Sequence, residues 1–132
     1  MARSLLLAAM LLVAAATPVA AEEIDTWAPL VEQRKDVVVA RLAVCESHGS
    51  AHPDRSGYIG PFQFSTRTVI AFVRERDGRT ISAVEAQALA RDEAQAAALA
   101  KYVIFERNGY GHWPACSRKL GLARQVSQID RL

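Results

Sequence analysis

The chain has 132 residues, 51% of them hydrophobic, and its 16 Lys and Arg residues nearly balance its 14 Asp and Glu residues. This length suits a short leader and one small domain, and it excludes two domains. The charge balance lacks the basic excess that is typical of nucleic-acid binding, so we predict no nucleic-acid partner.

The first 21 residues have the pattern of a secretory signal peptide. Arg3 precedes an apolar stretch of 12 residues, Leu5 to Ala16, and small residues follow at Val19-Ala20-Ala21. The stretch is shorter than the roughly 20 apolar residues that span a bilayer, and no later stretch is long enough. We therefore predict cleavage after Ala21, export to the periplasm or the medium, and a mature domain over residues 22–132 without a membrane span.

The elements expected after this leader are mostly helical. Apolar residues at helical spacing predict a helix over residues 30–45, preceded by a short polar segment over 22–29. Glycine and proline in residues 47–61 predict a loop. Apolar positions in residues 66–76 predict a short helix that the turn signal Asp77-Gly78 ends.

A capping box from Ser82 to Glu85 begins the clearest helix pattern, because each of these side chains can accept a hydrogen bond from the other residue's backbone N–H. This helix is expected to run to about Arg107, where Asn108-Gly109 ends it. Residues 120–132 predict a short amphipathic helix. No strand alternation or internal repeat is evident, so the fold class is mostly α.

The two cysteines, Cys45 and Cys116, are the even count expected for a disulfide in an exported chain. They lie 71 residues apart, and closing a loop of that size would stabilise the fold by about 4 kcal/mol in the chain-entropy model. The alternative is a pair of buried free thiols, which suits an exported protein less well.

Glu46 is the candidate acid. A carboxyl group can act as a general acid when a partly apolar setting keeps its pKa high. Glu46 follows an apolar run directly and precedes the glycine-rich loop. It is therefore expected at the end of a helix, at the border of a cleft.

Three segments in chain order resemble the resuscitation-promoting factors. They are Cys45 to Gly49 (CESHG), Gly57 to Ser65 (GYIGPFQFS) and Gly109 to Ser117 (GYGHWPACS). The Glu-Ser and Gly-x-x-Gln elements are also similar to those of the soluble lytic transglycosylases. The resemblance covers residues 30–117, leaving a tail at 118–132. It implies a small lysozyme-like, transglycosylase-like α domain with one disulfide between the two cysteines.

The resemblance also assigns roles to single residues. It implies that Glu46 is catalytic and that Ser47 supports the loop by hydrogen bonding beside the substrate. It places Tyr58 and Gln63 at the glycan groove and Trp113 among the substrate-binding residues. The alternatives are packing for Tyr58 and Trp113 and a cap of the following helix for Gln63.

The sequence departs from the family pattern at three places. His48 occupies a glycine position, Pro61-Phe62 stands for Gly-Leu, and Phe72 lies near a usual tryptophan. These differences concern the substrate subsites more than the acid.

Glu46, His48 and His52 are of residue types that bind metals. Gly49 and Pro53 interrupt any helix that would align them, and no further ligand is implied. We therefore predict no metal and no cofactor.

The function implied by the resemblance is a lytic transglycosylase that cuts the MurNAc-GlcNAc β-1,4 bond of peptidoglycan glycan strands, with Glu46 as acid and then as base. A muramidase-type hydrolase is the alternative chemistry, and Asp54 is the nearby candidate for the second carboxylate that it needs. A non-catalytic peptidoglycan-binding accessory module is the alternative of a different class. No protein partner is indicated.

Overall fold

The first helix, α1, sets the frame of the molecule. The computed structural model describes residues 27–132, and the predicted signal peptide lies outside the described residues. Within that part of the chain, six α-helices and one small hairpin form a lysozyme-like, mostly α domain, as predicted. In chain order the elements are α1 (Trp27–Ser47), β1 (Tyr58–Ile59), β2 (Phe64–Ser65), α2 (Thr66–Asp77), α3 (Ala83–Arg91), α4 (Glu93–Arg107), the 3-10 helix η1 (Tyr110–His112), α5 (Pro114–Leu120) and α6 (Leu122–Ile129).

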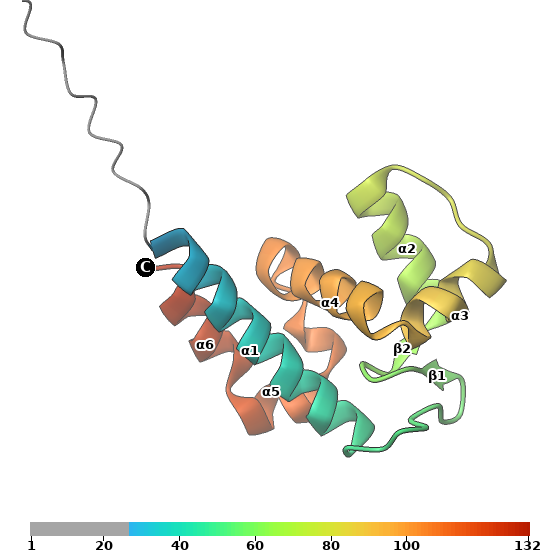
Figure 1. Ribbon diagram of the computed structural model, residues 1–132, viewed down its shortest axis with the longest axis horizontal. Helices are drawn as coiled ribbons and strands as arrows, with labels where there is room; N and C mark the ends of the chain where they lie inside the picture. Colours follow the sequence, from blue (N-terminus) through green and yellow to red (C-terminus); the bar gives the residue numbers. More distant parts are fainter. Residues whose placement is uncertain (1–26) are drawn as a thin grey trace, which may run out of the picture.

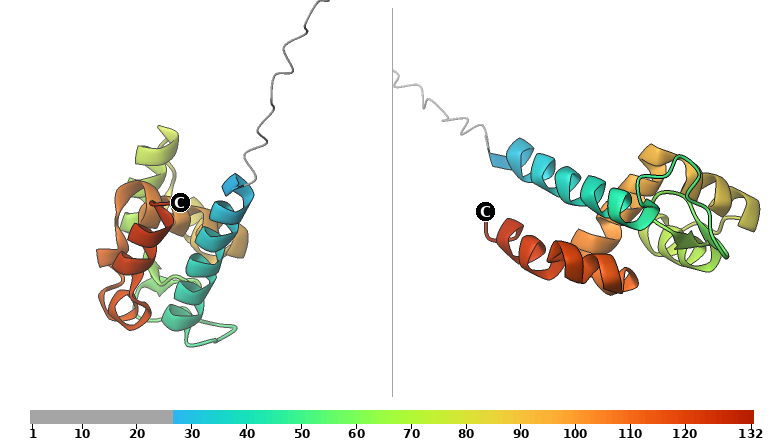
Figure 2. Two further views of the ribbon diagram at one scale, coloured as in Figure 1. Left: turned by 90° about the vertical axis from the view of Figure 1, so that its left-hand side faces the viewer. Right: turned by 90° about the horizontal axis from the view of Figure 1, so that it is seen from below.

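The helices gather at two ends of the molecule, and α4 connects these ends. In Figures 1 and 2, α1 and α6 lie side by side, and the C-terminus lies near the start of α1. The other end holds α2, α3 and the hairpin (Figure 1). Helix α4 contacts α1, α2 and α3, so it couples the end of the molecule that carries the hairpin to the helix that carries Glu46.

Helix α1 is longer than predicted. It begins at Trp27 rather than Leu30, so the expected polar lead over 22–29 is wrong for its last three residues. Pro29 lies in the first turn of the helix. Backbone N–H groups in this turn have no partner within the helix, so a proline there costs no hydrogen bond. The three consecutive valines Val37-Val38-Val39 have weak helix propensity because they are β-branched. Val38 and Val39 are buried in the core, and tertiary packing of this kind outweighs propensity.

The single helix predicted from the capping box to Arg107 is wrong, because the structure divides it into α3 and α4 at Asp92. The Asp92 carboxylate accepts a hydrogen bond from the Gln95 backbone N–H at 2.8 Å and caps α4. The Asp92 backbone N–H still donates to Ala88 at the end of α3. An aspartate side chain offers the backbone such an alternative partner, so the Gln95 N–H keeps a hydrogen bond where the chain turns.

The other predicted boundaries largely agree with the structure. The capping box is present, with Ser82 and Glu85 bonded in both directions. Gly78 and Asn108 end their helices in the left-handed conformation. The helix predicted over 120–132 is present as α6, but α5 before it was not expected.

The hairpin was also not expected from the sequence. Strands β1 and β2 pair antiparallel, with Tyr58 opposite Ser65 and Ile59 opposite Phe64. Each strand has two residues, which is too short for an alternating pattern to be recognised.

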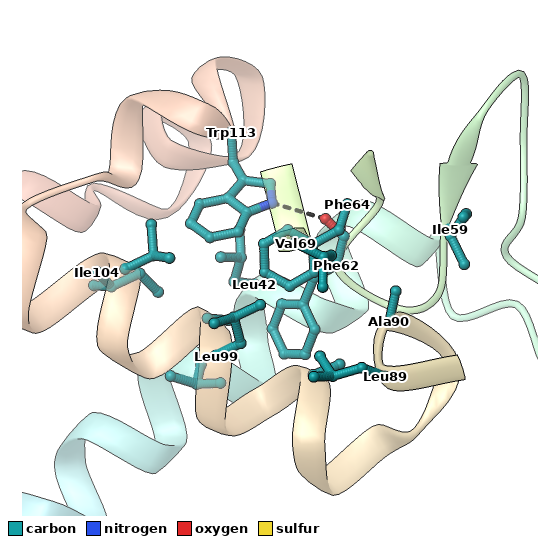
Figure 3. Close-up of a cluster of buried hydrophobic side chains, with 14 of the residues drawn as sticks. Leu42, Ile59, Phe62, Phe64, Val69, Leu89, Ala90, Leu99, Ile104 and Trp113 are labelled. Atoms are coloured by element: carbon teal, nitrogen blue, oxygen red, sulfur yellow. Dashed lines mark hydrogen bonds between the residues drawn. The ribbon is translucent and has the colours of Figure 1, made fainter. Parts of the chain in front are cut away.

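The core takes buried side chains from the hairpin and from each of α1 to α6, and Figure 3 shows a cluster of them. The Trp113 indole packs against Phe64, with ring centroids 5.5 Å apart. Its Nε1–H donates to the Phe62 carbonyl oxygen at 2.7 Å, drawn as the dashed line in Figure 3. Through these two contacts, Trp113 attaches η1 and α5 to the hairpin.

The predicted disulfide is confirmed. Cys45 in the last turns of α1 is bonded to Cys116 in α5, with Cα atoms 6.0 Å apart. The bond attaches the helix end that carries Glu46 to the C-terminal helices.

Candidate functional site

Glu46 lies in the last turn of α1, on the face that points toward the core. It follows Leu42 by four residues and Val39 by seven, and these spacings place the three side chains on one face of the helix. Val39 and Leu42 are buried, and Glu46 is partly buried where this stripe reaches the helix end. Burial raises the pKa of the Glu46 carboxyl, against the opposing positive charges of His48 and Arg55. The setting therefore favours a protonated acid.

The loop after Glu46 begins with a sharp turn. His48 and Gly49 both adopt positive φ, 54° and 70°. The buried Ser47 hydroxyl accepts a hydrogen bond from the Gly49 backbone N–H at 3.2 Å. Ser47 thus holds the turn directly beside the acid, in the loop-supporting position expected from the sequence.

Arg55 is a residue of this site that the sequence analysis missed. Its Nη2 donates to the backbone carbonyl oxygen of Glu46 at 2.9 Å. The backbones of Arg55 and Tyr58 exchange two hydrogen bonds of 2.9 and 2.8 Å, which hold the arginine in a tight turn. A cation at the C-terminal end of a helix is favourable for the helix dipole, but nothing in the loop sequence indicates that Arg55 folds back onto α1.

Hydrogen bonds to the loop and to α3 hold the Asp54 carboxylate in place. One carboxylate oxygen accepts from the Gly60 backbone N–H at 2.8 Å, and the other accepts from Nε of Arg91 at 2.9 Å. The Gly60 N–H lowers the pKa of Asp54 most strongly; burial opposes it, and the hydrogen bond and charge of Arg91 lower the pKa further. Asp54 therefore attaches the loop to α3.

Gly60 brings the loop into direct contact with α3. Its φ is +72°, and a Cβ atom at this position would lie 1.8 Å from the carbonyl oxygen of Ala90. Only a residue without a side chain fits both conditions, so the loop and α3 meet backbone to backbone.

Gln63 cross-links the same loop. Its side-chain amide donates to the carbonyl oxygens of Pro53 and Gly60, at 2.7 and 2.9 Å. It does not cap α2, because that position belongs to Ser65, whose hydroxyl accepts from the Thr68 N–H. The glutamine thus shapes the loop from within.

The two aromatic candidates lie in different surroundings. Tyr58 is 53% exposed on β1, where its ring is available to a ligand. Trp113 is only 3% exposed, and its indole N–H is already bonded to Phe62. The contacts of Trp113 support the packing interpretation.

A hollow of about 610 Å³ adjoins the end of α1. The loop at residues 49–54 and the junction of α3 and α4 border it, and Ser47 and Asp54 are among its lining residues. Glu46 is not among them. Of the residues predicted for the site, the structure thus gathers Glu46, Ser47, Asp54 and Gln63 around one loop, and leaves Trp113 in the core.

Within residues 27–132, no group of three or more His, Cys, Asp or Glu side chains is placed to hold a metal ion. Over the same range, no helix is long and apolar enough to cross a membrane.

A small disulfide-bonded helical domain, with a partly buried glutamate at the end of its first long helix, defines a lysozyme-like domain. Among curated proteins, the chain is similar to Resuscitation-promoting factor Rpf1 of Corynebacterium glutamicum, with 36% identity over 104 residues. The match covers 78% of this chain and 50% of Rpf1, so the chain spans about half the length of that relative. The resemblance to the resuscitation-promoting factors is thereby confirmed. No family model matches the chain, and no solved structure matches it.

Proposed function

We propose that the protein is exported and cleaves peptidoglycan glycan strands as a lytic transglycosylase, at the β-1,4 bond between N-acetylmuramic acid and N-acetylglucosamine. The observation that carries the proposal is the partly buried Glu46 carboxyl at the end of α1, whose pKa burial raises. The similarity to a resuscitation-promoting factor supports the peptidoglycan substrate that the motifs imply. The predicted signal peptide and the Cys45–Cys116 disulfide support export.

The reaction uses one carboxyl group twice. Glu46 donates its proton to the glycosidic oxygen as the bond from that oxygen to C1 of the muramic acid breaks. The neighbouring N-acetyl group stabilises the cationic centre. The Glu46 carboxylate then takes the proton of the 6-hydroxyl while O6 bonds to C1. The products are a strand with a free 4-hydroxyl and a strand with a 1,6-anhydro end.

The contacts of Asp54 favour this route over two-carboxylate hydrolysis. A second carboxylate would have to act as a nucleophile or activate a water molecule. Both Asp54 oxygens are instead engaged, one by the Gly60 N–H and the other by Arg91. The route that uses Glu46 alone does not need Asp54 as a reacting group.

Product analysis tests the proposal. Purified sacculi are incubated with the mature protein, residues 22–132, and the soluble products are separated and weighed by mass spectrometry. Anhydro-muropeptides are the expected result. Reducing ends would instead establish hydrolysis, and binding to sacculi without any product would establish an accessory module.

A further inference from the structure

The hollow beside α1 lies next to the acid, but the Glu46 side chain is not part of its lining. The lining includes Ser47, the residue directly after Glu46. Successive side chains point about 100° apart around a helix. A ligand in the hollow would therefore lie beside a glycan strand at Glu46 and would not take its place.

The hollow continues as a groove between α1 and α4. A second hollow of about 380 Å³ shares Ala43, Pro61 and Glu93 with the first. We call the two together the α1–α4 channel. Its walls between the helices are mainly methyl groups, contributed by Ala40, Ala43, Ala94, Ala97 and Ala98.

Two side chains of opposite charge lie where the hollows meet α3 and α4. Arg91 uses its Nε for Asp54, and its two terminal amino groups have no protein partner among the described residues. The Glu93 carboxylate has neither a hydrogen bond nor an ion pair within residues 27–132. Both residues are exposed and line the first hollow. The channel thus combines a guanidinium group with free N–H donors, a free carboxylate and apolar walls.

We infer that the α1–α4 channel binds the stem peptide carried by the glycan strand that Glu46 cleaves, an inference that rests on the proposed function. A stem peptide combines alanine methyl groups, carboxylates and the amine of a diamino acid, which matches the alanine walls, Arg91 and Glu93. Guanidinium groups bind carboxylates in a planar, paired geometry. The first hollow begins at Ser47, directly after the acid, so a stem peptide on a muramic acid at Glu46 starts beside the channel and extends by about 3.5 Å per residue.

Paired substrates separate peptide binding from glycan cleavage. We compare solubilised strands that carry their stem peptides with the same strands after an amidase has removed the peptides. Glu93→Gln removes the anion, and Ala98→Phe fills the groove from an exposed position. Glu106→Gln and Ala71→Phe are the matched controls, because both residues are exposed and line neither hollow.

We expect Glu93→Gln to lower kcat/KM on peptide-bearing strands about tenfold, the size typical of losing one hydrogen bond to a charged group. Ala98→Phe should lower it by about the same factor, because the ring occupies the groove. Cleavage of the stripped strands should not change, and the controls should behave as wild type on both substrates. An equal loss on both substrates, or no loss on either, would overturn the inference and leave the proposed function intact.

A binding measurement decides the case in which the wild-type protein cuts neither substrate. Free stem tetrapeptide is titrated into the isotope-labelled wild-type protein, and backbone amide signals are followed by NMR. Shifts at Ser50 and Glu93 that Ala98→Phe abolishes would support the peptide site even though the proposed cleavage had failed. Unchanged signals at these residues would overturn it.

Discussion

At the scale of single residues, Glu46 and Asp54 have opposite environments. Burial raises the pKa of Glu46, whereas the Gly60 N–H and Arg91 lower the pKa of Asp54. Environments that separate the pKa values of two carboxyl groups are how proteins assign acid and base roles. The Glu46 carboxyl, whose pKa is raised, accepts no hydrogen bond from residues 27–132, whereas the Asp54 carboxylate is engaged in holding the loop.

The first prediction concerns the acid. Glu46→Gln keeps the size of the side chain but cannot donate an acidic proton, so cleavage of sacculi should fall by about a hundredfold or more. Asp54→Asn is the control. It keeps an acceptor for Gly60 and should retain much of the activity and the anhydro product. Release of soluble muropeptides measures both variants, and circular dichroism checks folding. A folded Glu46→Gln protein with the wild-type rate would refute the catalytic assignment.

The second prediction concerns pH. The acid step needs protonated Glu46, so kcat/KM should decline as pH rises through the raised pKa of this group. Arg55 is a positive charge that lowers that pKa, and removing it by Arg55→Met should move the alkaline limb of the profile to higher pH. Arg55→Lys, which keeps the charge, should leave the limb near its wild-type position. A limb that moves to lower pH in Arg55→Met would contradict this electrostatic account.

At the scale of elements, the loop between α1 and the hairpin depends on its attachment to α3. Asp54, Gly60 and Gln63 hold this loop through side-chain and backbone contacts. The break at Asp92 lets α3 turn away from α4, with Arg91 beside the loop. Glu46 is therefore positioned by a helix end and a loop that α3 braces.

The third prediction tests that bracing. Gly60→Ala adds a Cβ atom against the Ala90 carbonyl at positive φ, so the free energy of unfolding should fall by about 2–4 kcal/mol from strain and overpacking together. Gly57→Ala is the matched control, because Gly57 also has positive φ but nothing lies within 4 Å of the added atom. It should cost about 1–2 kcal/mol. Urea unfolding measures both, and equal losses would show that the contact with α3 is unimportant.

At the scale of the whole molecule, one covalent bond joins the helix that carries Glu46 to the C-terminal helices. Cys45 and Cys116 lie 71 residues apart in the sequence. The chain between them contains the loop, the hairpin and α2 to α4. A small domain with a modest core gains stability from such a closed loop.

The fourth prediction follows from this bond. Replacing both cysteines by alanine should lower the free energy of unfolding by about 4 kcal/mol, chiefly because the unfolded chain regains its freedom. Chemical unfolding of the oxidised protein and the variant gives the difference. Mass spectrometry of the native protein should show the loss of two hydrogens and one cross-linked peptide pair. Two free thiols in the exported protein would contradict the prediction.

The sequence alone determined the features that depend on neighbours along the chain or on a short motif. The capping box at Ser82, the helix end at Asn108 and the position of Glu46 at a helix-to-loop junction are local, because backbone hydrogen bonding and helical periodicity act over a few residues. The pairing of Cys45 with Cys116 followed from their count and from the family resemblance.

Only the tertiary structure decided which distant side chains meet. Arg55 folds back onto the Glu46 carbonyl, Asp54 reaches Arg91, and Trp113 donates to Phe62. These contacts depend on how helices pack around a common core, and no short sequence pattern encodes them. The same holds for the division of α3 from α4, because the Asp92 side chain can serve a helix interior or a cap, and packing selects the cap.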